Sequence, residues 1–233
     1  MKIYERLSRV YDLDWGNYAG QYVNLISQLF DEQGISRARI LDLACGTGTL
    51  ALELVKRSHA VFGIDISPQM IAIAKSKCSG FSHVSFEVQD MTQFCADGKF
   101  DLITCTFDSV NYLLNTDAVK AMFLRVASAL FESGLFVFDS NTDRLYVNRH
   151  HGIHQRKLGG ETFIQKLNYD SAKKEATTIF EFSDGEVELH RQRPYDLTEL
   201  GPILAESGFS ILRKYSGFDK KSYDSESERL ICI

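Results

Sequence analysis

Hydrophobic positions between residues 18 and 139 follow two alternating periods. Short apolar runs rich in β-branched residues alternate with stretches in which apolar residues recur every three to four positions. The runs predict strands at 38–43, 60–65, 84–88, 100–106 and 135–139, and the stretches predict helices at 18–30, 49–57, 68–77 and 118–131. Strands separated by helices in this order form βαβ units, so the pattern predicts a parallel sheet with helices on its faces.

The pattern changes after Asp139. Three stretches between 161 and 193 have strand composition and are separated by turn residues, which predicts antiparallel hairpins. A helix at 198–207 and strands at 209–215 and 229–233 are expected to complete the fold. We therefore expect a single domain over 1–233, with an N-terminal helical lid at about 1–35 and an antiparallel β insertion at about 144–195.

Composition narrows the class of protein. The chain has 233 residues, of which 44% are hydrophobic and 24% charged, as in a soluble globular domain. The net charge is −5 and neither half is basic, which disfavours a nucleic-acid partner. Five scattered cysteines without a C-x-x-C pair indicate free thiols in a reducing compartment. With no apolar leader or membrane-spanning run in the sequence, we expect a cytoplasmic protein without a membrane partner.

The segment 40–50, Ile-Leu-Asp-Leu-Ala-Cys-Gly-Thr-Gly-Thr-Leu, places a glycine turn between a buried strand and a helix. Such a turn presents backbone N–H groups and a helix N-terminus at the edge of the sheet. Gly46 and Gly48 would let a ligand approach the backbone closely, because they carry no Cβ. Together with Ala51, they also fit the dinucleotide fingerprint G-x-G-x-x-A, so the glycines leave the ligand open.

Asp42, at the mouth of this turn, favours a ligand without phosphate. A carboxylate there would repel a pyrophosphate by roughly 4 kcal/mol per charge pair at 4 Å and an effective dielectric constant near 20. S-adenosylmethionine carries a sulfonium and an ammonium instead, both of which a carboxylate attracts. The alternative is that Asp42 only caps the turn.

Two further acids lie at the ends of successive predicted strands. Asp65 ends the second strand, where it could accept hydrogen bonds from both ribose hydroxyls, and Asp90 ends the third, where it could accept one from the adenine amino group. Ile66, Met70 and Met91 could enclose the purine, although Met70 could also be ordinary core. Acids at three successive strand ends form a more specific pattern than the glycines.

The segments LDLACGTG (41–48), GIDISPQM (63–70), QDM (89–91) and FDLITCTFDSVNYLL (100–114) resemble the motif series of class I methyltransferases. The resemblance is to the small-molecule branch that includes bacterial aminosugar N-methyltransferases. It implies a Rossmann-like α/β fold, with a mostly parallel seven-stranded sheet flanked by helices and an antiparallel β insertion after strand five, and S-adenosyl-L-methionine as cofactor. Ala44 stands where many members have the first glycine. The expected cofactor-binding residues are Tyr11, Asp42, Ala44, Cys45, Gly46, Gly48, Asp65, Ile66, Met70, Asp90, Met91 and Thr106.

The expected activity is methyl transfer to a small molecule by in-line displacement at the sulfonium methyl, with nitrogen preferred over oxygen as acceptor. Such a reaction depends mainly on alignment, which can supply about 7–11 kcal/mol of the barrier. Asp108 and Asn111, with Tyr112, follow the fourth strand and are candidates to position the acceptor, as is Tyr11. Asp108 could equally be a helix cap, and the resemblance implies that Tyr11 contacts the cofactor's carboxylate.

The segment 144–157 is expected to be a loop. It carries Arg144, Arg149, Arg156, Lys157 and three histidines, with no acid among them. It could be a solvated loop, or it could draw in an anionic acceptor. A metal site is the least favoured interpretation, because no acid completes a ligand set, so no metal is expected and turnover should survive chelation. His190, beside Glu186 and Glu188, is expected on the surface.

Three other functions compete with this interpretation. An NAD(P)-dependent oxidoreductase would share the glycine turn, but Asp42 and Asp90 disfavour it. A catalytically silent module that binds S-adenosylmethionine is compatible with every motif. An RNA methyltransferase is disfavoured by the charge and by the absence of an added RNA-binding domain in this sequence.

Overall fold

A seven-stranded sheet forms the centre of the computed structural model, which describes residues 3–233 except for the side chain of Asn17. The strand order is β10-β11-β5-β4-β1-β2-β3. The strands are β1 (Arg39–Leu43), β2 (Ala60–Asp65), β3 (Val84–Val88), β4 (Phe100–Cys105), β5 (Leu130–Asn141), β10 (Lys214–Tyr215) and β11 (Arg229–Cys232). β1 to β5 run parallel, while β11 pairs antiparallel with β5. This confirms the Rossmann-like fold class expected from the sequence.

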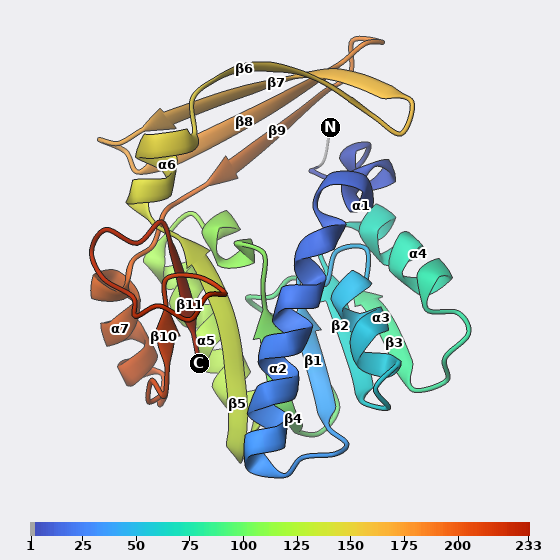
Figure 1. Ribbon diagram of the computed structural model, residues 1–233, viewed down its shortest axis with the longest axis vertical. Helices are drawn as coiled ribbons and strands as arrows, with labels where there is room; N and C mark the ends of the chain where they lie inside the picture. Colours follow the sequence, from blue (N-terminus) through green and yellow to red (C-terminus); the bar gives the residue numbers. More distant parts are fainter. Residues whose placement is uncertain (1–2) are drawn as a thin grey trace.

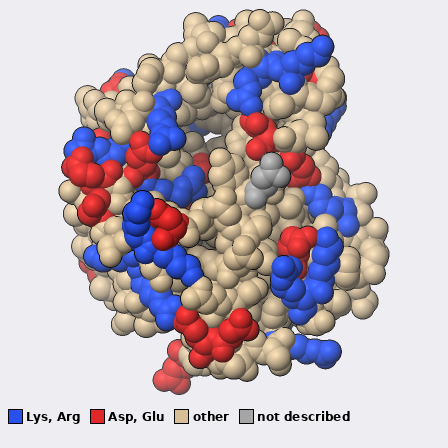
Figure 2. Space-filling model, in the orientation of Figure 1, with Lys and Arg blue, Asp and Glu red and all other residues tan. Residues whose placement is uncertain are grey.

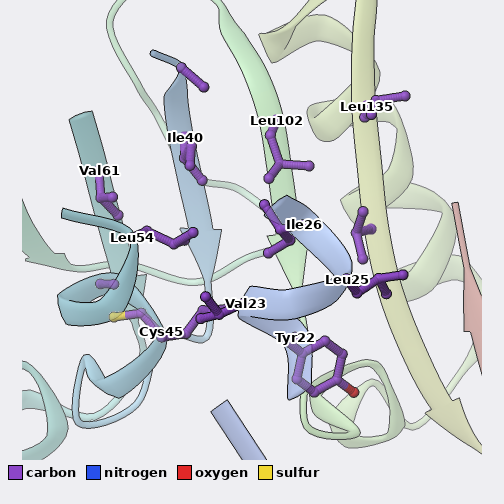
Figure 3. Close-up of a cluster of buried hydrophobic side chains, with 14 of the residues drawn as sticks. Tyr22, Val23, Leu25, Ile26, Ile40, Cys45, Leu54, Val61, Leu102 and Leu135 are labelled. Carbon is purple, nitrogen blue, oxygen red and sulfur yellow. The ribbon is translucent and has the colours of Figure 1, made fainter. Parts of the chain in front are cut away.

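Helices cover both faces of this sheet because the strand side chains alternate between them. The helices are α1 (Tyr11–Asp14), α2 (Ala19–Gln33), α3 (Thr49–Val55), α4 (Pro68–Lys77), α5 (Thr116–Ala129), α6 (Asp143–Arg149) and α7 (Leu197–Glu206). In β1, Ile40 belongs to one core cluster with residues of α2 and α3, among them Ile26 and Leu54, which Figure 3 labels. Leu41 belongs to the other core cluster, with residues of α5 and α7. Both cores hold the carboxyl ends of β1 to β4 in fixed positions.

A second, four-stranded antiparallel sheet lies apart from the first as a separate layer (Figure 1). Its strands are β6 (Gly152–Leu158), β7 (Glu161–Asp170), β8 (Glu175–Phe182) and β9 (Val187–Gln192), paired in sequence order. The chain reaches this layer through α6, directly after β5, and returns from it to α7. The hairpins expected between 161 and 193 are therefore confirmed.

The expectation that residues 144–157 form a loop was wrong. Residues of this segment form all of α6 except its first residue, Asp143, and all of β6 except its last, Leu158. The seven residues of β6 pair with β7 along their whole length. Its arginines also have acidic partners: Arg144 pairs with Glu226, Arg149 with Glu228 and Arg156 with Asp14. These ion pairs compensate three of the four fixed positive charges of the segment.

The N-terminal segment before α1 is fastened to the second sheet. The carboxylate of Glu188, on β9, accepts hydrogen bonds from the backbone N–H groups of Tyr4 and Leu7, each at 3.0 Å, and from that of Arg6. The Arg6 guanidinium also pairs with Glu161 of β7. In Figure 1 this segment and α1 lie between the two sheets. The contacts hold residues 4–7 over the carboxyl ends of β1 and β2.

Candidate active site

A cavity of about 540 Å³ opens at the carboxyl ends of the parallel strands. Its lining includes every residue expected to bind the cofactor except Gly48: Tyr11, Asp42, Ala44, Cys45, Gly46, Asp65, Ile66, Met70, Asp90, Met91 and Thr106. Ligands of open α/β sheets bind at this edge, because the turns after the strands meet there. The cavity is large enough for a nucleoside-sized ligand.

The glycine turn between β1 and α3 has three residues in the left-handed conformation. Ala44 has φ 52°, Gly46 φ 55° and Gly48 φ 74°. A Cβ built on Gly46 would meet none of the described atoms within 4 Å, so the space beside it belongs to the cavity. A Cβ on Gly48 would lie 2.8 Å from the Cβ of Ala74 on α4. Gly48 therefore permits the packing of two helices, rather than forming part of the cavity wall.

Asp42 is a buried carboxylate with one unsatisfied oxygen. It is 2% exposed, and Oδ1 accepts a hydrogen bond of 2.7 Å from the Thr104 hydroxyl. Within residues 3–233, no group donates to Oδ2. Burial raises the pKa of Asp42 to about 7, against the effect of the Thr104 hydrogen bond. A buried acceptor of this kind is costly unless a partner reaches it, and a ligand cation in the cavity would provide one.

Asp65 and Asp90 line the same cavity from the ends of β2 and β3. The Asp65 carboxylate accepts hydrogen bonds from the backbone N–H groups of Gly46, at 2.9 Å, and Ser67, at 2.8 Å. Burial raises the pKa of Asp65, and these two hydrogen bonds oppose the shift. Asp90 is half-buried, and its Oδ1 accepts from the Thr92 N–H and hydroxyl, both at 2.8 Å. Each carboxylate has further lone pairs available to hydroxyl or amino groups.

The start of α1 closes one side of the cavity. The Thr47 hydroxyl donates to Asp12 Oδ1 at 2.5 Å, and Lys77 Nζ lies 2.6 Å from Asp12 Oδ2. The Tyr11 ring stacks on that of Trp15, with the ring centroids 5.3 Å apart, and both rings line the cavity. The aromatic cluster thus faces the site, and an ion pair holds it against the glycine turn.

A second cavity, of about 330 Å³, lies beneath the antiparallel sheet. It shares Tyr4, Tyr11, Trp15, Phe107 and Tyr112 with the first, so these five aromatic residues form the boundary between the two. Its polar lining is Asp108, Asn141, His150, Gln165, Thr178, His190, Gln192 and Arg229. Figure 2 shows the surface hollowed between the layer of β6–β9 and the rest of the molecule.

Asp108 lies at the floor of this second cavity, in a charged network that links three elements. Its Oδ2 accepts a 2.7 Å hydrogen bond from Gln192 of β9, and its Oδ1 lies 3.4 Å from Arg229 of β11. Arg229 also pairs with Asp139, which is fully buried at the end of β5. Burial raises the pKa of Asp108 to about 6, although Arg229 acts to lower it. Asp108 has φ 51°, so its backbone is strained where it faces the cavity.

Asn111 lies outside the described lining of both cavities. Its amide nitrogen donates to the carbonyls of Asn141 and Arg193, at 2.9 and 2.8 Å, and its amide oxygen accepts from the Asn141 N–H at 2.9 Å. These bonds join the turn after β4 to β5 and to the segment that leads into α7. The neighbouring Tyr112 lines both cavities.

The expectation that His190 lies on the surface was wrong. His190 is 3% exposed and Glu188 is 0% exposed, because the N-terminal segment covers the face of β9 that carries them. Alternate polar residues at 188, 190 and 192 on one face of a strand resemble a solvated face. Sequence reasoning also missed Tyr4 and Arg229, whose hydrogen-bond partners lie at least 90 residues away in the chain.

The arrangement of the main sheet, the glycine turn and three acidic strand ends defines the class I methyltransferase fold. A methyltransferase domain family matches residues 40–134. A protein of Geobacillus sp. (strain WCH70) named as a methyltransferase is 32% identical over 205 residues, which cover 84% of this chain and 83% of the relative. The chain belongs to the S-adenosylmethionine-dependent methyltransferases, and it is therefore an enzyme of the transferase class.

Two solved structures share this fold. An S-adenosylmethionine-dependent methyltransferase from Clostridium acetobutylicum has a TM-score of 0.84 and 25% identity, and the match covers 98% of this chain and 97% of that one. The sugar N-methyltransferase KedS8 from Streptoalloteichus has a TM-score of 0.73 and 19% identity, and the match covers 96% of this chain and 92% of that one. The second likeness extends to the fold alone.

No helix within residues 3–233 combines the length and the apolar character needed to cross a membrane. In the same residues, no three His, Cys, Asp or Glu side chains gather closely enough to hold a metal ion.

Proposed function

We propose that this enzyme transfers a methyl group from S-adenosylmethionine in the first cavity to the nitrogen of a small amine in the second. The observation that carries the proposal is the aromatic boundary between the two cavities, formed by Tyr4, Tyr11, Trp15, Phe107 and Tyr112. A donor and an acceptor on opposite sides of such a boundary would meet with little water between them. The bound cofactor supplies a methyl group on positively charged sulfur, and the protein supplies alignment.

The residues of the first cavity fit this cofactor. The unsatisfied Oδ2 of Asp42 suits its ammonium group, and the strand-end acids Asp65 and Asp90 suit the ribose hydroxyls and the adenine amino group. We assign the purine to Ile66, Met70 and Met91, the methionine portion to Tyr11, Ala44, Cys45, Gly46 and Thr106, and only a packing role to Gly48. A dinucleotide phosphate would instead meet the buried Asp42 carboxylate.

The charges of the second cavity favour an amine over an anion. Asp108 and Asp139 together carry two negative charges, and Arg229 balances only one of them. The aromatic walls also favour a cation, because ring faces attract ammonium groups. The arginines of 144–157 were the reason to expect an acceptor with a carboxylate or phosphate. They are already paired with acidic side chains.

We expect the affinity for S-adenosylmethionine to rise several-fold between about pH 5 and about pH 7. The pKa of Asp42 is about 7, so its carboxyl is mostly neutral at the lower pH. An ammonium beside it favours the charged form, so binding releases a proton and tightens as the pH rises toward that pKa. Calorimetry in two buffers of different ionisation enthalpy measures both the affinity and the proton release.

Two controls isolate this effect. The variant Asp42→Asn has no proton to release, so its affinity should not change over this pH range. 5′-Methylthioadenosine lacks the ammonium group and should bind the wild-type enzyme with equal affinity at both pH values. Equal pH dependence for both ligands would contradict the assignment of the ammonium to Asp42.

The test of the function is a panel of acceptors scored by release of S-adenosylhomocysteine. The amines are glucosamine, ethanolamine, glycine and histamine, and the hydroxyl probes are glucose and catechol. We expect turnover with at least one amine and none with glucose or catechol. Binding of S-adenosylmethionine should also raise the thermal midpoint of unfolding, because at 100 times its dissociation constant a ligand adds about 2.7 kcal/mol to the stability of the folded state. NAD should not raise this midpoint. Cofactor binding without turnover on a broad acceptor panel would instead indicate a silent binding module.

A further inference from the structure

Four side chains form a continuous hydrogen-bonded chain at the boundary between the two cavities. The hydroxyls of Tyr4 and Tyr112 lie 2.6 Å apart, and the Tyr112 hydroxyl lies 3.0 Å from Nδ1 of His190. On the far side of the imidazole, Nε2 lies 3.2 Å from Oε2 of Glu188. The phenols line both cavities, and the chain ends at a carboxylate with no solvent exposure.

The direction of these hydrogen bonds follows from the carboxylate. Burial acts to raise the pKa of Glu188, but hydrogen bonds from His190 and from the N–H groups of Arg6 and Leu7 outweigh it and hold the pKa below its usual range. An ionised carboxylate can only accept, so Nε2 of His190 must carry the hydrogen. In the neutral imidazole Nδ1 is then an acceptor, and the Tyr112 hydroxyl donates to it.

The same reasoning extends to the end of the chain. Because the Tyr112 hydrogen points to His190, the Tyr112 oxygen accepts from the Tyr4 hydroxyl. The Tyr4 oxygen keeps a lone pair for a hydrogen donor in the cavity. Burial raises the pKa of both phenols well above 10, so they stay neutral hydroxyls and can pass a proton on without holding a negative charge.

We propose that Glu188, His190, Tyr112 and Tyr4 form a proton relay that takes the proton from the acceptor amine and holds it on His190. Tyr4 is the catalytic residue that touches the acceptor, and Tyr112 passes the proton on. His190 receives it as the general base, and Glu188 is a positioning residue that orients the imidazole and stabilises its charged form. The order carboxylate, imidazole and hydroxyl is the one by which other enzymes activate a nucleophile. The inference rests on the proposed function.

The methyl transfer is balanced in protons and electrons. The acceptor nitrogen, bound as an ammonium, first loses a proton, which frees its lone pair. The lone pair forms the new bond to the methyl carbon, and the electrons of the broken methyl–sulfur bond stay on sulfur. The proton that the nitrogen loses moves to the Tyr4 oxygen, the Tyr4 proton to Tyr112, and the Tyr112 proton to Nδ1 of His190. The imidazolium beside Glu188 returns its proton to water when the product leaves. No oxidant, reductant or metal takes part.

Asp108 is the rival base, because it lines the same cavity and its pKa is raised to about 6. Both of its oxygens, however, already face donors, Gln192 at 2.7 Å and Arg229 at 3.4 Å. The groups that face His190 are Glu188 from its own strand, Tyr112 from the turn after β4 and Tyr4 from the N-terminal segment, while β8 contributes the uncharged Phe180 ring. His190 therefore has a negative partner on one side and a proton path on the other.

The first experiment needs no acceptor. Long-range ¹H–¹⁵N spectra of the histidine-labelled free protein should show a hydrogen on Nε2 of His190 and Nδ1 as a hydrogen-bond acceptor. Tyr112→Phe should move the Nδ1 resonance of His190, because it removes the hydrogen bond to that atom. Tyr169→Phe is the matched control, since its hydroxyl bonds to Asp143 and lies outside the described lining of both cavities. A hydrogen on Nδ1, or no response to Tyr112→Phe, would overturn the relay.

The second experiment measures turnover with the four amines of the panel. General-base catalysis contributes about 10²–10⁴-fold, so Tyr112→Phe and His190→Gln should each lower kcat by about 100-fold or more. KM for the amine and the affinity for S-adenosylhomocysteine should stay within about twofold. The fall of kcat at low pH in the wild type should disappear in His190→Gln. His154→Gln, on the exposed strand β6, is the control and should match the wild type.

The outcomes separate the two proposals. Wild-type kcat in both variants, with normal turnover by the parent enzyme, would overturn the relay alone. A pH profile that persists in His190→Gln and disappears in Asp108→Asn would assign the proton to Asp108 and also overturn it. A wild-type enzyme that methylates neither these amines nor any of a wider set would contradict the proposed function, while the spectra would still decide whether the relay exists.

Discussion

Arg229→Met is expected to destabilise the protein by about 3 kcal/mol, because it leaves a buried negative charge without a partner. Arg229 pairs with Asp139, whose side chain has no solvent exposure, and its other guanidinium nitrogen lies 3.4 Å from Asp108. Methionine keeps the length of the side chain but removes the charge. Urea unfolding followed by circular dichroism measures the loss.

Arg144→Met is the matched control, since the partner of Arg144 is the exposed Glu226. Exposed ion pairs contribute about 0–1 kcal/mol, so this variant should unfold close to the wild type. Asp139→Asn combined with Arg229→Met should recover part of the stability, because the fully buried charge of Asp139 is then removed and only Asp108 is left without its cationic partner. Equal losses in the two single variants would mean that the buried pair contributes no more than a surface pair does.

The main sheet could be predicted from local signals. The strands expected at 60–65 and 84–88 agree with β2 and β3 at both ends. β2 is a mostly buried apolar run, and β3 alternates apolar and polar residues with Phe86 buried. The helix that follows Ser67 starts where expected, since the Ser67 hydroxyl accepts from the Met70 N–H and Pro68 takes the first helical position. The acids at 42, 65 and 90 could be placed together because parallel strands end at one edge.

β6 could not be predicted, for a physical reason. It is the edge strand of the second sheet, and most of its residues are exposed. With no buried face it has no alternation of apolar and polar residues, which is the signal that sequence reasoning depends on. Its pairing with β7 comes instead from a hairpin at Gly159-Gly160, where both glycines have positive φ.

The chemistry of the second cavity depends on contacts between distant parts of the chain. Glu188 and His190 look like surface residues until the N-terminal segment, more than 180 residues earlier, covers them. Arg229 meets Asp108 only because β11 pairs with β5. No local pattern encodes such contacts, so for the second cavity the sequence indicated Tyr11, Asp108 and Tyr112 but none of their distant partners.

Asp65→Ala is expected to weaken binding of S-adenosylmethionine by at least about tenfold. If the carboxylate accepts from both ribose hydroxyls, the variant loses charge-assisted hydrogen bonds of about 1.5–3 kcal/mol each. It also leaves the N–H groups of Gly46 and Ser67 without their acceptor, which loosens the glycine turn. Asp65→Asn should do less harm, because its amide oxygen can still accept one of these bonds. Isothermal calorimetry gives the affinities.

Asp101→Ala is the control. Asp101 also accepts a backbone hydrogen bond, 2.7 Å from the Arg39 N–H, but it stands at the start of β4, at the opposite edge of the sheet. Adenosine and 2′,3′-dideoxyadenosine separate the ribose contact from the loosened turn. The wild type should prefer adenosine, and Asp65→Ala should bind the two alike, because without the carboxylate the hydroxyls have lost their acceptor. A preference for adenosine that survives in Asp65→Ala would assign the ribose hydroxyls to another residue and leave Asp65 the role of holding the turn.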